Sequence, residues 1–328
     1  MKREWEERAR TDPQGYIGRG YADSDAQFWA SGEPDLTQLI LDGLQVDNGA
    51  AVLEIGCGVG RLLRPLSTRV QRAIGVDIAP AMVAQGRQLL ADLPNVEFHV
   101  TTGRLAFIAD AALDLVYSFA VFQHIPSKRA IATYIAEAAR VLKAGGMLKI
   151  QVDGRRRPFW RGTDTWLGVW YSAGEIRRVL ESADFTLVDT WGAQTQYYWL
   201  TAVRNPSSGR LATSSIQAPL PRWNLVALGA LLGRLGHEPG DQPRAIADGR
   251  RALREYTLVF LKKHRAASPA EFVRAAFATL LNRAPDAGGL EFYVAQLARG
   301  GSRAYLLDCL LASAELRRAL RAPASPAT

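Results

Sequence analysis

The sequence predicts an α/β fold in which a doubly wound, largely parallel sheet is followed by a small all-α domain near the C-terminus. Short, almost wholly apolar runs recur between residues 50 and 152, and stretches of helical spacing separate them, which is typical of a parallel sheet covered on both faces. From residue 268 onward the apolar residues recur at helical spacing. The chain has 328 residues, 48% hydrophobic and 22% charged, so a large core and two domains are expected.

Seven apolar runs are expected to form the strands of the sheet. They are residues 50–56, 72–78, 96–100, 113–119, 147–152, 185–191 and 197–203. Helical stretches separate the first five, such as residues 131–142, where Lys143 and Gly145-Gly146 indicate the end of a helix. The last two runs are too close together for a crossover connection, so we expect an antiparallel pair at the edge of the sheet.

Composition divides the chain into four segments. We expect an N-terminal helical segment, a sheet domain, a basic linker or insertion, and a domain of three short helices that begins with the capping box Ser268-Pro269-Ala270-Glu271. Their bounds are 1–49, 50–204, 205–265 and 266–322.

The basic segment contains two apolar runs. Residues 225–233 are expected to form a buried helix, with a segment lying on a membrane surface as the alternative. Residues 255–263 have the composition of a strand, although no sheet can be assigned to them.

Positive charge is concentrated in one part of the chain. The net charge is +8, yet residues 1–203 sum to −1, whereas residues 204–265 carry 11 basic and 4 acidic side chains. An enzyme acting on nucleic acid more often has its basic surface around the active site, so no nucleic-acid substrate is expected. Residues 204–265 and the C-terminal helices could make peripheral contact with a membrane, a glycan or a partner protein, with a solvated linker as the alternative.

Cysteine content and hydropathy bear on the compartment. Cys57 and Cys309 are far apart, which argues against a disulfide framework or a thiolate metal site. The opening residues MKREWEERAR lack the apolar region of a secretory signal, and no run approaches the roughly 18 apolar residues of a membrane span. We therefore expect a cytoplasmic protein.

The most informative motif is VLEIGCGVG at residues 52–60. A strand ends at Glu54-Ile55, and the chain then turns through three glycines, which permit positive φ and let a ligand approach the backbone. About 20 residues later a second strand ends in Asp77, where a carboxylate can accept hydrogen bonds from a ribose diol. No Lys-Ser/Thr pair follows the glycines, so a phosphate-binding P-loop is not expected.

Residues 1–204 resemble the class I S-adenosylmethionine-dependent methyltransferases. The matches, in the order and spacing of the family, are VLEIGCGVGR (52–61), IGVDIAPAMV (74–83), NVEFHVTTG (95–103), LDLVYSFAVFQHIP (113–126) and RVLKAGGMLKIQV (140–152). The resemblance implies a Rossmann-like, seven-stranded methyltransferase sheet whose last strand is antiparallel. It also implies that S-adenosyl-L-methionine is the cofactor and that the N-terminal segment folds over it as a lid.

The resemblance also assigns a set of cofactor contacts. It implies that the glycine turn passes under the methionine part, that Glu54 orients the turn, and that Asp77 holds the ribose hydroxyls. Where the family often has an acidic residue facing the adenine amine this chain has Thr102, which indicates a weakened contact or readout by backbone groups near Gly103 and Arg104. The remaining expected contacts are Gly56, Cys57, Gly58, Gly60, Arg61, Ile78, Met82, Ser118 and Phe119.

Methyl transfer from a sulfonium requires alignment of the acceptor and, for a hydroxyl, removal of its proton. His124 follows the fourth strand, where this fold exposes residues to the methyl group, and an ordinary histidine pKa suits a base at neutral pH. The alternative is that His124 only bonds backbone at a helix start. Asp153, at the end of the fifth strand, is a second candidate base, with a turn residue as the alternative.

No metal is expected at this site. The segment GRRRPFWRG (154–162) supplies arginines where a metal-dependent mechanism needs clustered carboxylates. These arginines either face an anionic substrate or belong to a solvated loop.

The acceptor is expected to be a small molecule, sugar or glycan precursor that is methylated on oxygen. Aromatic side chains that could form its pocket, or simply pack on the sheet, are Tyr16, Tyr21, Phe28 and Trp29. Two alternatives remain: N-methylation of a metabolite or protein, and a non-catalytic scaffold with a degenerate cofactor site.

Residues 272–316 are similar to a short, uncharacterised bacterial helical domain that has been likened to phycobilisome linkers. The matching pieces include Leu281-Asn282-Arg283-Ala284-Pro285-Asp286 and Ser313-Ala314-Glu315. This resemblance implies an interaction or docking role and favours a saccharide acceptor.

Overall fold

The computed structural model describes most of the chain and divides it into two compact units. The first unit consists of Met1–Thr190 with Tyr198–Leu220, and the second of Trp191–Tyr197 with Pro221–Thr328. The described residues are 1–17, 24–156, 164–205, 216–217, 260–261, 263–299, 302–311 and 313–320.

Some of the sequence predictions fall outside the described residues. The apolar run 225–233 does so entirely, as do Tyr21 and the arginines at 157 and 161. Within the expected strand 255–263, residues 260, 261 and 263 are described, and they are helical rather than extended.

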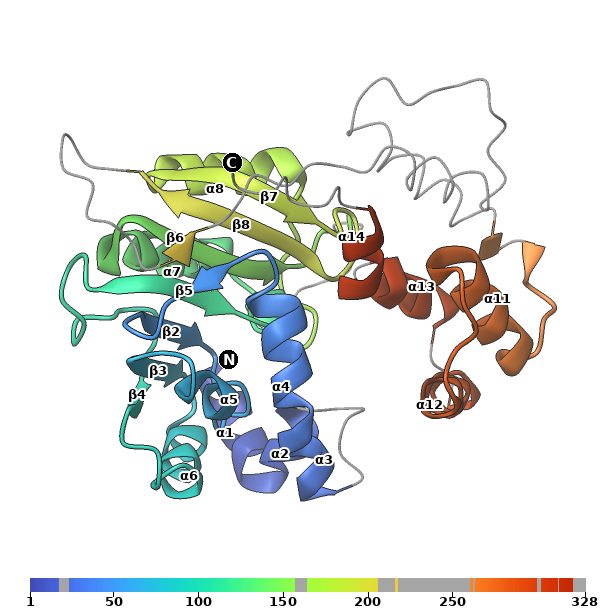
Figure 1. Ribbon diagram of the computed structural model, residues 1–328, viewed down its shortest axis with the longest axis horizontal. Helices are drawn as coiled ribbons and strands as arrows, with labels where there is room; N and C mark the ends of the chain where they lie inside the picture. The colour runs from blue at the N-terminus through green and yellow to red at the C-terminus, as the bar shows by residue number, and fades with distance from the viewer. Residues whose placement is uncertain are drawn as a thin grey trace. The chain divides into compact units, whose positions relative to one another are not determined.

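The core of the first unit is a seven-stranded sheet with the strand order β4-β3-β2-β5-β6-β8-β7 (Figure 1). The five strands from β4 to β6 are parallel, and β8 runs antiparallel to β6. This arrangement confirms the predicted doubly wound sheet. Its strands are β2 (Ala51–Ile55), β3 (Arg72–Asp77), β4 (Val96–Val100), β5 (Leu113–Ser118), β6 (Leu142–Val152), β7 (Phe185–Trp191) and β8 (Tyr198–Arg204).

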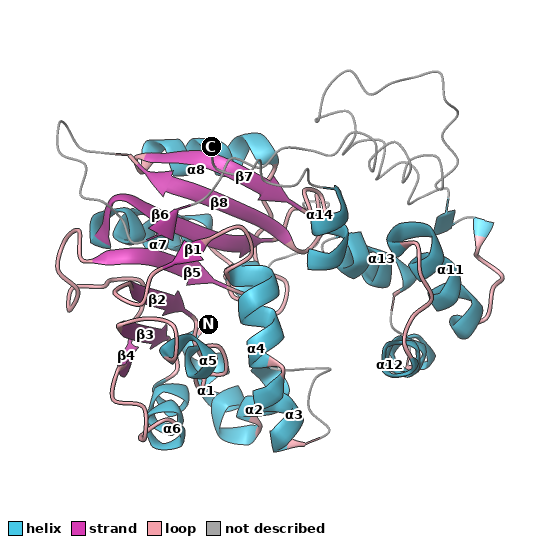
Figure 2. Cartoon of the chain, viewed as in Figure 1, coloured by secondary structure: helices cyan, strands magenta, loops and turns pink. Residues whose placement is uncertain are grey.

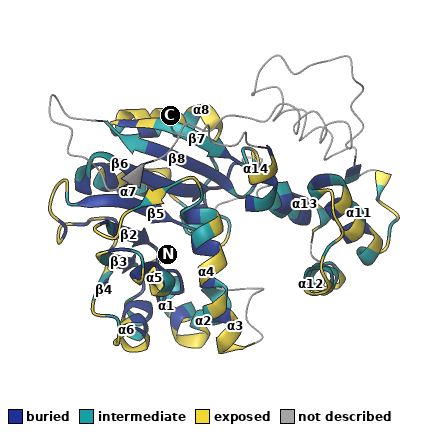
Figure 3. Cartoon of the chain, viewed as in Figure 1, coloured by how far each residue is buried: buried dark blue, intermediate teal, exposed yellow. Residues whose placement is uncertain are grey.

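Burial explains why the central strands read as unbroken apolar runs. Every residue of β5 is buried, and so are four of the five residues of β2, because neighbouring strands and covering helices exclude water from both faces (Figure 3). At the edge, β7 has five of its seven residues exposed or half-buried. A separate two-stranded pair joins β1 (Gln45–Val46) to β9 (Ile216–Gln217).

Helices surround the sheet (Figure 2). The π-helix η1 (Leu36–Ile40) continues α4, and the short 3₁₀ helix η2 (Phe122–His124) follows β5. The other helices of this unit are α1 (Lys2–Thr11), α2 (Pro13–Ile17), α3 (Asp25–Ala30), α4 (Gly32–Asp35), α5 (Leu63–Ser67), α6 (Pro80–Leu89), α7 (Lys128–Val141) and α8 (Ala173–Ser182).

Strand β6 begins earlier than its apolar run indicates. Helix α7 ends at Val141, and Leu142 already pairs with Leu113 of β5. The register then shifts, so that Met147 pairs with Leu115. The residues between Leu142 and Met147 contain the two glycines predicted to end the helix, and they form a bulge in the ladder rather than a separate loop.

Apart from Trp191–Tyr197, the described part of the second unit is mainly helical. Its helices are α11 (Pro269–Leu281), α12 (Ala287–Ala298), α13 (Arg303–Leu311) and α14 (Ala314–Leu320). The predicted capping box is present at Ser268 and Glu271. The last of the three expected helices is two, α13 and α14, because the Ser313 hydroxyl accepts a hydrogen bond from the Leu316 amide and starts a new helix. This corrects the expectation of three helices.

None of the helices in the described ranges combines the length and the apolar character of a membrane span. Cys57, which is buried, and Cys309, which is half-buried, do not form a disulfide.

Candidate active site

The turn after β2 requires glycine. Gly56, Gly58 and Gly60 have φ values of +79°, +53° and +92°. A Cβ added at Gly56 would lie 2.3 Å from Cγ2 of Val121, and one at Gly58 would lie 2.4 Å from Cδ1 of Ile17. Both positive φ and close approach therefore exclude larger residues at this edge of the sheet.

Asp77 closes the turn from the neighbouring strand. Its Oδ2 accepts a hydrogen bond from the Gly58 amide at 3.0 Å, and its Oδ1 accepts one from the Ala79 amide at 2.9 Å. Burial raises the pKa of this carboxyl, and the backbone donors oppose the rise. The glycine turn and Asp77 thus lie within hydrogen-bonding distance of each other. The amides of Gly58, Ile78 and Ala79 use three of the roughly four acceptor sites of the carboxylate, which leaves one for a further donor.

Glu54 is a buried carboxyl beside the turn. The Tyr117 hydroxyl donates to its Oε2 at 3.0 Å. Burial raises the pKa of Glu54 to about 8, although the Tyr117 bond and the positive charge of Arg61 lower it. The group is therefore mainly protonated at neutral pH, and a cation bound nearby would favour its ionised form.

Between these groups lies a cavity of about 40 Å³. Pockets for small ligands usually measure about 300–1,000 Å³, so a nucleoside requires a wider opening than this conformation provides. The residues that line the cavity are Ile17, Glu54, Gly56, Cys57, Arg61, Leu62, Phe119 and Ala120.

The N-terminal helices close the cavity. Ala9 and Phe28 pack in one core cluster with Val59 and Met82, and Trp5 and Ile17 lie against it. The cluster places the N-terminal segment directly on the glycine turn, as the resemblance implies for a lid.

Two hydrogen bonds hold α1 on α6. Glu6 Oε2 accepts from the Ala81 amide at 3.0 Å, and Gln85 Nε2 donates to the Ala9 carbonyl at 3.1 Å. Cofactor entry therefore requires movement of α1 and α2.

Arg61 fixes the same segment from the other side. Its Nη1 donates to Asp35 Oδ2 at 2.7 Å and to Ser31 Oγ at 2.9 Å. The side chains of Arg61 and Asp35 are only 4% and 10% exposed. Arg61 was predicted as a cofactor contact; it lines the cavity, and its guanidinium also ties α4 to the glycine turn.

Three other predicted contacts serve the fold through their side chains. The Cys57 thiol lies under β3, where it would meet a Cβ at Gly75 at 2.6 Å, and burial raises its pKa. The Ser118 hydroxyl donates to the Ile55 carbonyl at 2.8 Å and joins β5 to β2. The ring of Phe119 stacks on Trp199 with the ring centroids 5.5 Å apart and also lines the cavity.

The expected adenine contacts lie along α6 and the end of β4. Met82 is buried in the cluster with Val59, and Ile78 is half-buried. Thr102 and Arg104 are exposed. Gly103, with φ of +118°, would place a Cβ 3.9 Å from the ring of Tyr134, which sequence reasoning missed.

A chain of amides determines the tautomer of His124. The Ala120 amide donates to Gln151 Oε1 at 2.9 Å, so Gln151 Nε2 must donate to Gln123 Oε1, at 2.8 Å. Gln123 Nε2 then donates to His124 Nε2 at 3.2 Å, and His124 Nδ1–H donates to the Trp166 carbonyl at 3.1 Å. Burial lowers the pKa of His124, and the bond to Trp166 opposes this, so the ring is neutral at pH 7. Its lone pair is on Nε2, facing Gln123.

Asp153 is engaged in an ion pair. Its carboxylate is 1% exposed and accepts from Arg155 Nη2 at 3.0 Å and from the Arg155 amide at 2.8 Å. As a base it would have to give up this partner. Arg155, one of the arginines expected either to face an anionic substrate or to lie in a solvated loop, thus forms its ion pair with Asp153 of the same loop.

Within the described ranges, no group of three or more His, Cys, Asp or Glu side chains is arranged to hold a metal ion.

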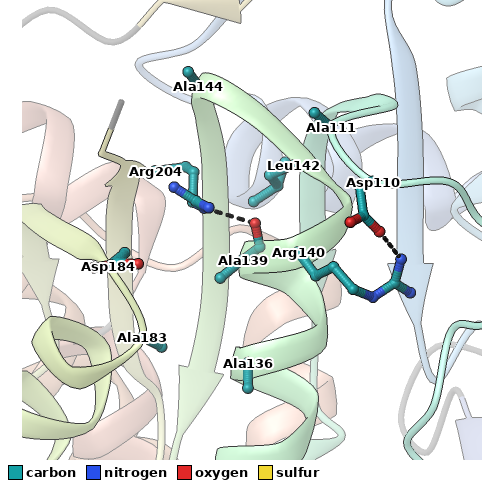
Figure 4. A pocket seen from close by; sticks show the side chains of 10 residues that line it. All are labelled: Asp110, Ala111, Ala136, Ala139, Arg140, Leu142, Ala144, Ala183, Asp184 and Arg204. Carbon is teal, nitrogen blue, oxygen red and sulfur yellow. Dashed lines mark hydrogen bonds and ion pairs between the residues drawn. The ribbon is translucent and has the colours of Figure 1, made fainter. Parts of the chain in front are cut away.

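A larger cavity, of about 600 Å³, lies at the other end of the strands, where the parallel strands β5 and β6 begin (Figure 4). Arg140 Nη1 donates to Asp110 Oδ1 and Arg204 Nε donates to the Ala139 carbonyl, each at 2.6 Å. Arg140 thus ties the C-terminal end of α7 to Asp110, and Arg204 ties the same end of the helix to β8. Because the glycine turn is at the opposite end of the strands, this cavity is not part of the candidate site.

The ionisation of Glu54 leads to a prediction about stability. In the unfolded chain this carboxyl has its ordinary pKa of 4.5, against about 8 in the folded protein. Between these values the folded state keeps a proton that the unfolded state loses, so the folded protein loses stability as pH rises. Glu54→Gln removes the ionisation, and we expect it to gain roughly 3–5 kcal/mol relative to the parent across this window.

Urea unfolding of both proteins at pH 4.5 and pH 8.5, without cofactor, measures this difference. A parallel pH dependence of the two proteins would show that Glu54 is not a buried, protonated carboxyl.

Comparison with known proteins identifies the class of this domain. Residues 52–146 match the family model described as a methyltransferase domain. A probable S-adenosylmethionine-dependent methyltransferase of Mycolicibacterium smegmatis is 34% identical over 150 residues, which cover 44% of this chain and 55% of that protein. The trans-aconitate 2-methyltransferase of Azoarcus is 35% identical over 115 residues, or 34% of this chain and 43% of that protein.

Among solved structures, magnesium protoporphyrin IX methyltransferase of Synechocystis, crystallised with S-adenosylmethionine, aligns with a TM-score of 0.45. It is 22% identical, and the alignment covers 62% of this chain and 97% of that one. Residues 259–319 match a domain of unknown function. This match lends no support to the expected likeness to phycobilisome linkers.

Residues 52–146 therefore match a methyltransferase domain, and S-adenosylmethionine is the cofactor named for the first of these relatives. The chain spans about half the length, or less, of the first two of these relatives. The residues of the site fit this cofactor: a turn restricted to glycine, a carboxylate with a free acceptor site at Asp77, and a carboxyl at Glu54 that a cation would ionise.

Sequence reasoning missed Trp5 and Arg8 near His124, Tyr117 bonded to Glu54, and Gln123 and Gln151 behind His124. A partial signal existed for the first two, because Trp5 and Arg8 are three residues apart in a helical segment and so share a face. No local pattern indicates Tyr117, Gln123 or Gln151. Tyr117 bonds to Glu54, which is 63 residues away in the chain, and Gln123 bonds to Gln151, which is 28 residues away.

Proposed function

We propose that the protein transfers a methyl group from S-adenosylmethionine to an oxygen atom of a small molecule, sugar or glycan precursor. The observation that supports this most directly is the contact of Asp77 with the glycine turn. It leaves a carboxylate beside a stretch of bare backbone, and few ligands other than a nucleoside need both.

The cofactor supplies an electrophilic methyl group on a sulfonium. Asp77 would accept hydrogen bonds from the ribose hydroxyls of the cofactor, and Glu54 would ionise in response to its positive charge. The helices α1 and α2, closed on the turn, exclude water from the reacting atoms. Alignment of the acceptor against the methyl group is expected to supply most of the acceleration.

We propose His124 as the base for a hydroxyl acceptor. Its neutral ring has the lone pair on Nε2, and the long bond from Gln123 is the interaction that an acceptor hydroxyl would replace. The bond from Nδ1 to the Trp166 carbonyl orients the ring and stabilises the imidazolium that forms. Asp153, already paired with Arg155, serves the loop and not the proton transfer.

Calorimetry of the full chain with S-adenosylmethionine and S-adenosylhomocysteine tests the cofactor. We expect saturable binding of both. The absence of binding heat and of any thermal shift would favour the non-catalytic scaffold, the second candidate, which the small closed cavity favours.

Replacing His124 by Ala is expected to reduce turnover at least about tenfold, because proton removal by a side chain contributes about 10²–10⁴-fold. Cofactor affinity should stay within about twofold of the parent. Methyl transfer from labelled cofactor measures the first quantity, and calorimetry measures the second. His99→Ala, on β4, is the matched control because the His99 ring stacks on Phe107 away from this network.

A second variant separates the base from a packing role. Asn at position 124 can still donate to the Trp166 carbonyl but cannot take up a proton at neutral pH. Recovery of turnover in His124→Asn would overturn the base assignment, whereas loss equal to that of His124→Ala supports it.

A further inference from the structure

We propose that the acceptor of this enzyme is an anion, and that Arg8 of α1 binds its acidic group, a carboxylate or a phosphate ester. The proposal rests on the proposed function for the statement that the ligand is the methyl acceptor. The binding of an anion at Arg8 can be tested without it.

The guanidinium of Arg8 lies among three aromatic rings. Its central carbon is 4.6 Å from the ring centroid of Trp5, 5.4 Å from that of Trp166 and 5.8 Å from that of Tyr16. Two of the rings come from the N-terminal helices and the third from the loop after β6. Such contacts attract a cation through the faces of the rings, yet they satisfy none of its N–H groups.

The Nη1 atom of Arg8 is buried and has no hydrogen-bond partner among the residues that the structure describes. In the described part of the chain no carboxylate forms an ion pair with Arg8. Glu4, one turn earlier in the same helix, has its pKa lowered by the N-terminal amine and in part by the charge of Arg8, but its carboxylate is engaged with the Thr165 hydroxyl at 3.2 Å and with that amine at 2.8 Å. Arg8 as a whole is half-buried, but a buried N–H donor of a cation is costly to leave without an acceptor unless an anion completes it.

Three other arginines of this unit, unlike Arg8, form ion pairs with carboxylates of the protein. Arg61 pairs with Asp35, and Arg140 with Asp110 and Glu137. Arg155 pairs with Asp153. Arg8 instead has aromatic walls and an open donor, which is the arrangement expected where the counter-ion arrives as a ligand.

The same rings connect Arg8 with the reacting end of the site. The rings of Trp5 and His124 meet edge to face with centroids 5.7 Å apart, and those of His124 and Trp166 are 5.4 Å apart. Trp5 also packs against the core cluster that contains Val59 of the glycine turn. An acidic group on Arg8 would therefore hold the rest of the acceptor beside His124, between aromatic faces suited to a flat ring or a sugar.

An anion here also assists the proposed base. The charge of Arg8 contributes to the lowered pKa of His124. A bound carboxylate or phosphate neutralises that charge and makes His124 more basic only when the acceptor is present.

The test compares three probes of the same size class: benzoate, phenyl phosphate and the neutral benzamide. Tryptophan fluorescence of the full chain is titrated with each probe at constant ionic strength. We expect both anions to bind at least about tenfold more tightly than benzamide, the equivalent of one charge-assisted hydrogen bond. The tighter of the two anions identifies the acceptor as a carboxylate or as a phosphate ester.

Arg8→Gln is expected to abolish the preference for anions, and Arg8→Lys to retain part of it. Arg3→Gln, which removes the same charge from an exposed position of α1, is the matched control and should leave the preference unchanged. Equal binding of all three probes by the parent protein, or an undiminished preference in Arg8→Gln, would overturn the proposal. Should Arg8→Gln fail to fold, the comparison of probes on the parent protein still decides.

Calorimetry with S-adenosylmethionine on the same preparations separates the two proposals. Cofactor binding without any preference for anions contradicts the role of Arg8 and leaves the methyltransferase proposal in place. A preference for anions without cofactor binding contradicts the proposed function and leaves the anion site in place.

Discussion

Asp77→Asn is expected to weaken S-adenosylmethionine binding by about a hundredfold. The carboxylate accepts hydrogen bonds from the amides of Gly58 and Ala79 with separate oxygens. An asparagine has one oxygen, so its NH₂ group must face one of these backbone N–H groups, donor against donor. The turn is then displaced, and charged hydrogen bonds to the ribose, at roughly 1.5–3 kcal/mol each, are lost as well.

The same variant should unfold more easily without cofactor, by about 1–3 kcal/mol, because one buried backbone amide is left without an acceptor. Calorimetry measures the affinity, and thermal or urea unfolding measures the stability. Asp92→Asn, an exposed position in the loop after α6, is the control and should change neither quantity. Unchanged cofactor affinity in Asp77→Asn would remove the basis for placing the ribose there.

Arg61→Met is expected to destabilise the first unit by about 3–5 kcal/mol, since it leaves the carboxylate of Asp35 buried without its partner. Burial already raises the pKa of Asp35, and loss of Arg61 removes the charge that opposes the rise. The defect should therefore be smaller at acidic pH, where Asp35 takes up a proton in both states. Urea unfolding at pH 7 and pH 4 measures the difference.

The chain contains a matched control for this experiment. Arg69 pairs with Glu33 at 2.5 Å, also between α4 and the region of α5, but these side chains are 34% and 50% exposed. Arg69→Met should cost less than about 1 kcal/mol because solvent screens the exposed pair. Replacing both partners, as Arg61→Met with Asp35→Leu, is expected to recover much of the loss. Equal losses in Arg61→Met and Arg69→Met would contradict this view of the buried pair.

Much of the sheet could be predicted because its signals are local. The run LDLVYS reads as a strand buried on both faces, and all six of its residues are buried in β5. The position of β8 between β6 and β7 could not be predicted from the sequence in the same way. Two closely spaced runs predict an antiparallel pair, but only packing determines which of the two pairs with β6.

In the candidate site, too, the backbone features could be predicted from the sequence, whereas the directions of several side chains could not. The glycines of the turn and Asp77 are close in sequence and use the backbone, so their spacing predicts their contact. The side chains of Cys57, Ser118 and Arg61 lie in the same motifs, yet they bond to the protein itself. A motif fixes where the backbone turns, while neighbouring elements decide which way a side chain faces.

The sequence by itself determined the class of the fold, the glycine turn and the carboxylate beside it, because apolar period and glycine conformation act over a few residues. Only the tertiary structure decided that the N-terminal helices close the site, that Gln123 and Gln151 orient His124, and that Arg8 lies among rings from α1, α2 and the loop after β6. These contacts join residues up to about 160 positions apart. They depend on which polar groups become neighbours when the elements pack, and no local sequence pattern encodes that.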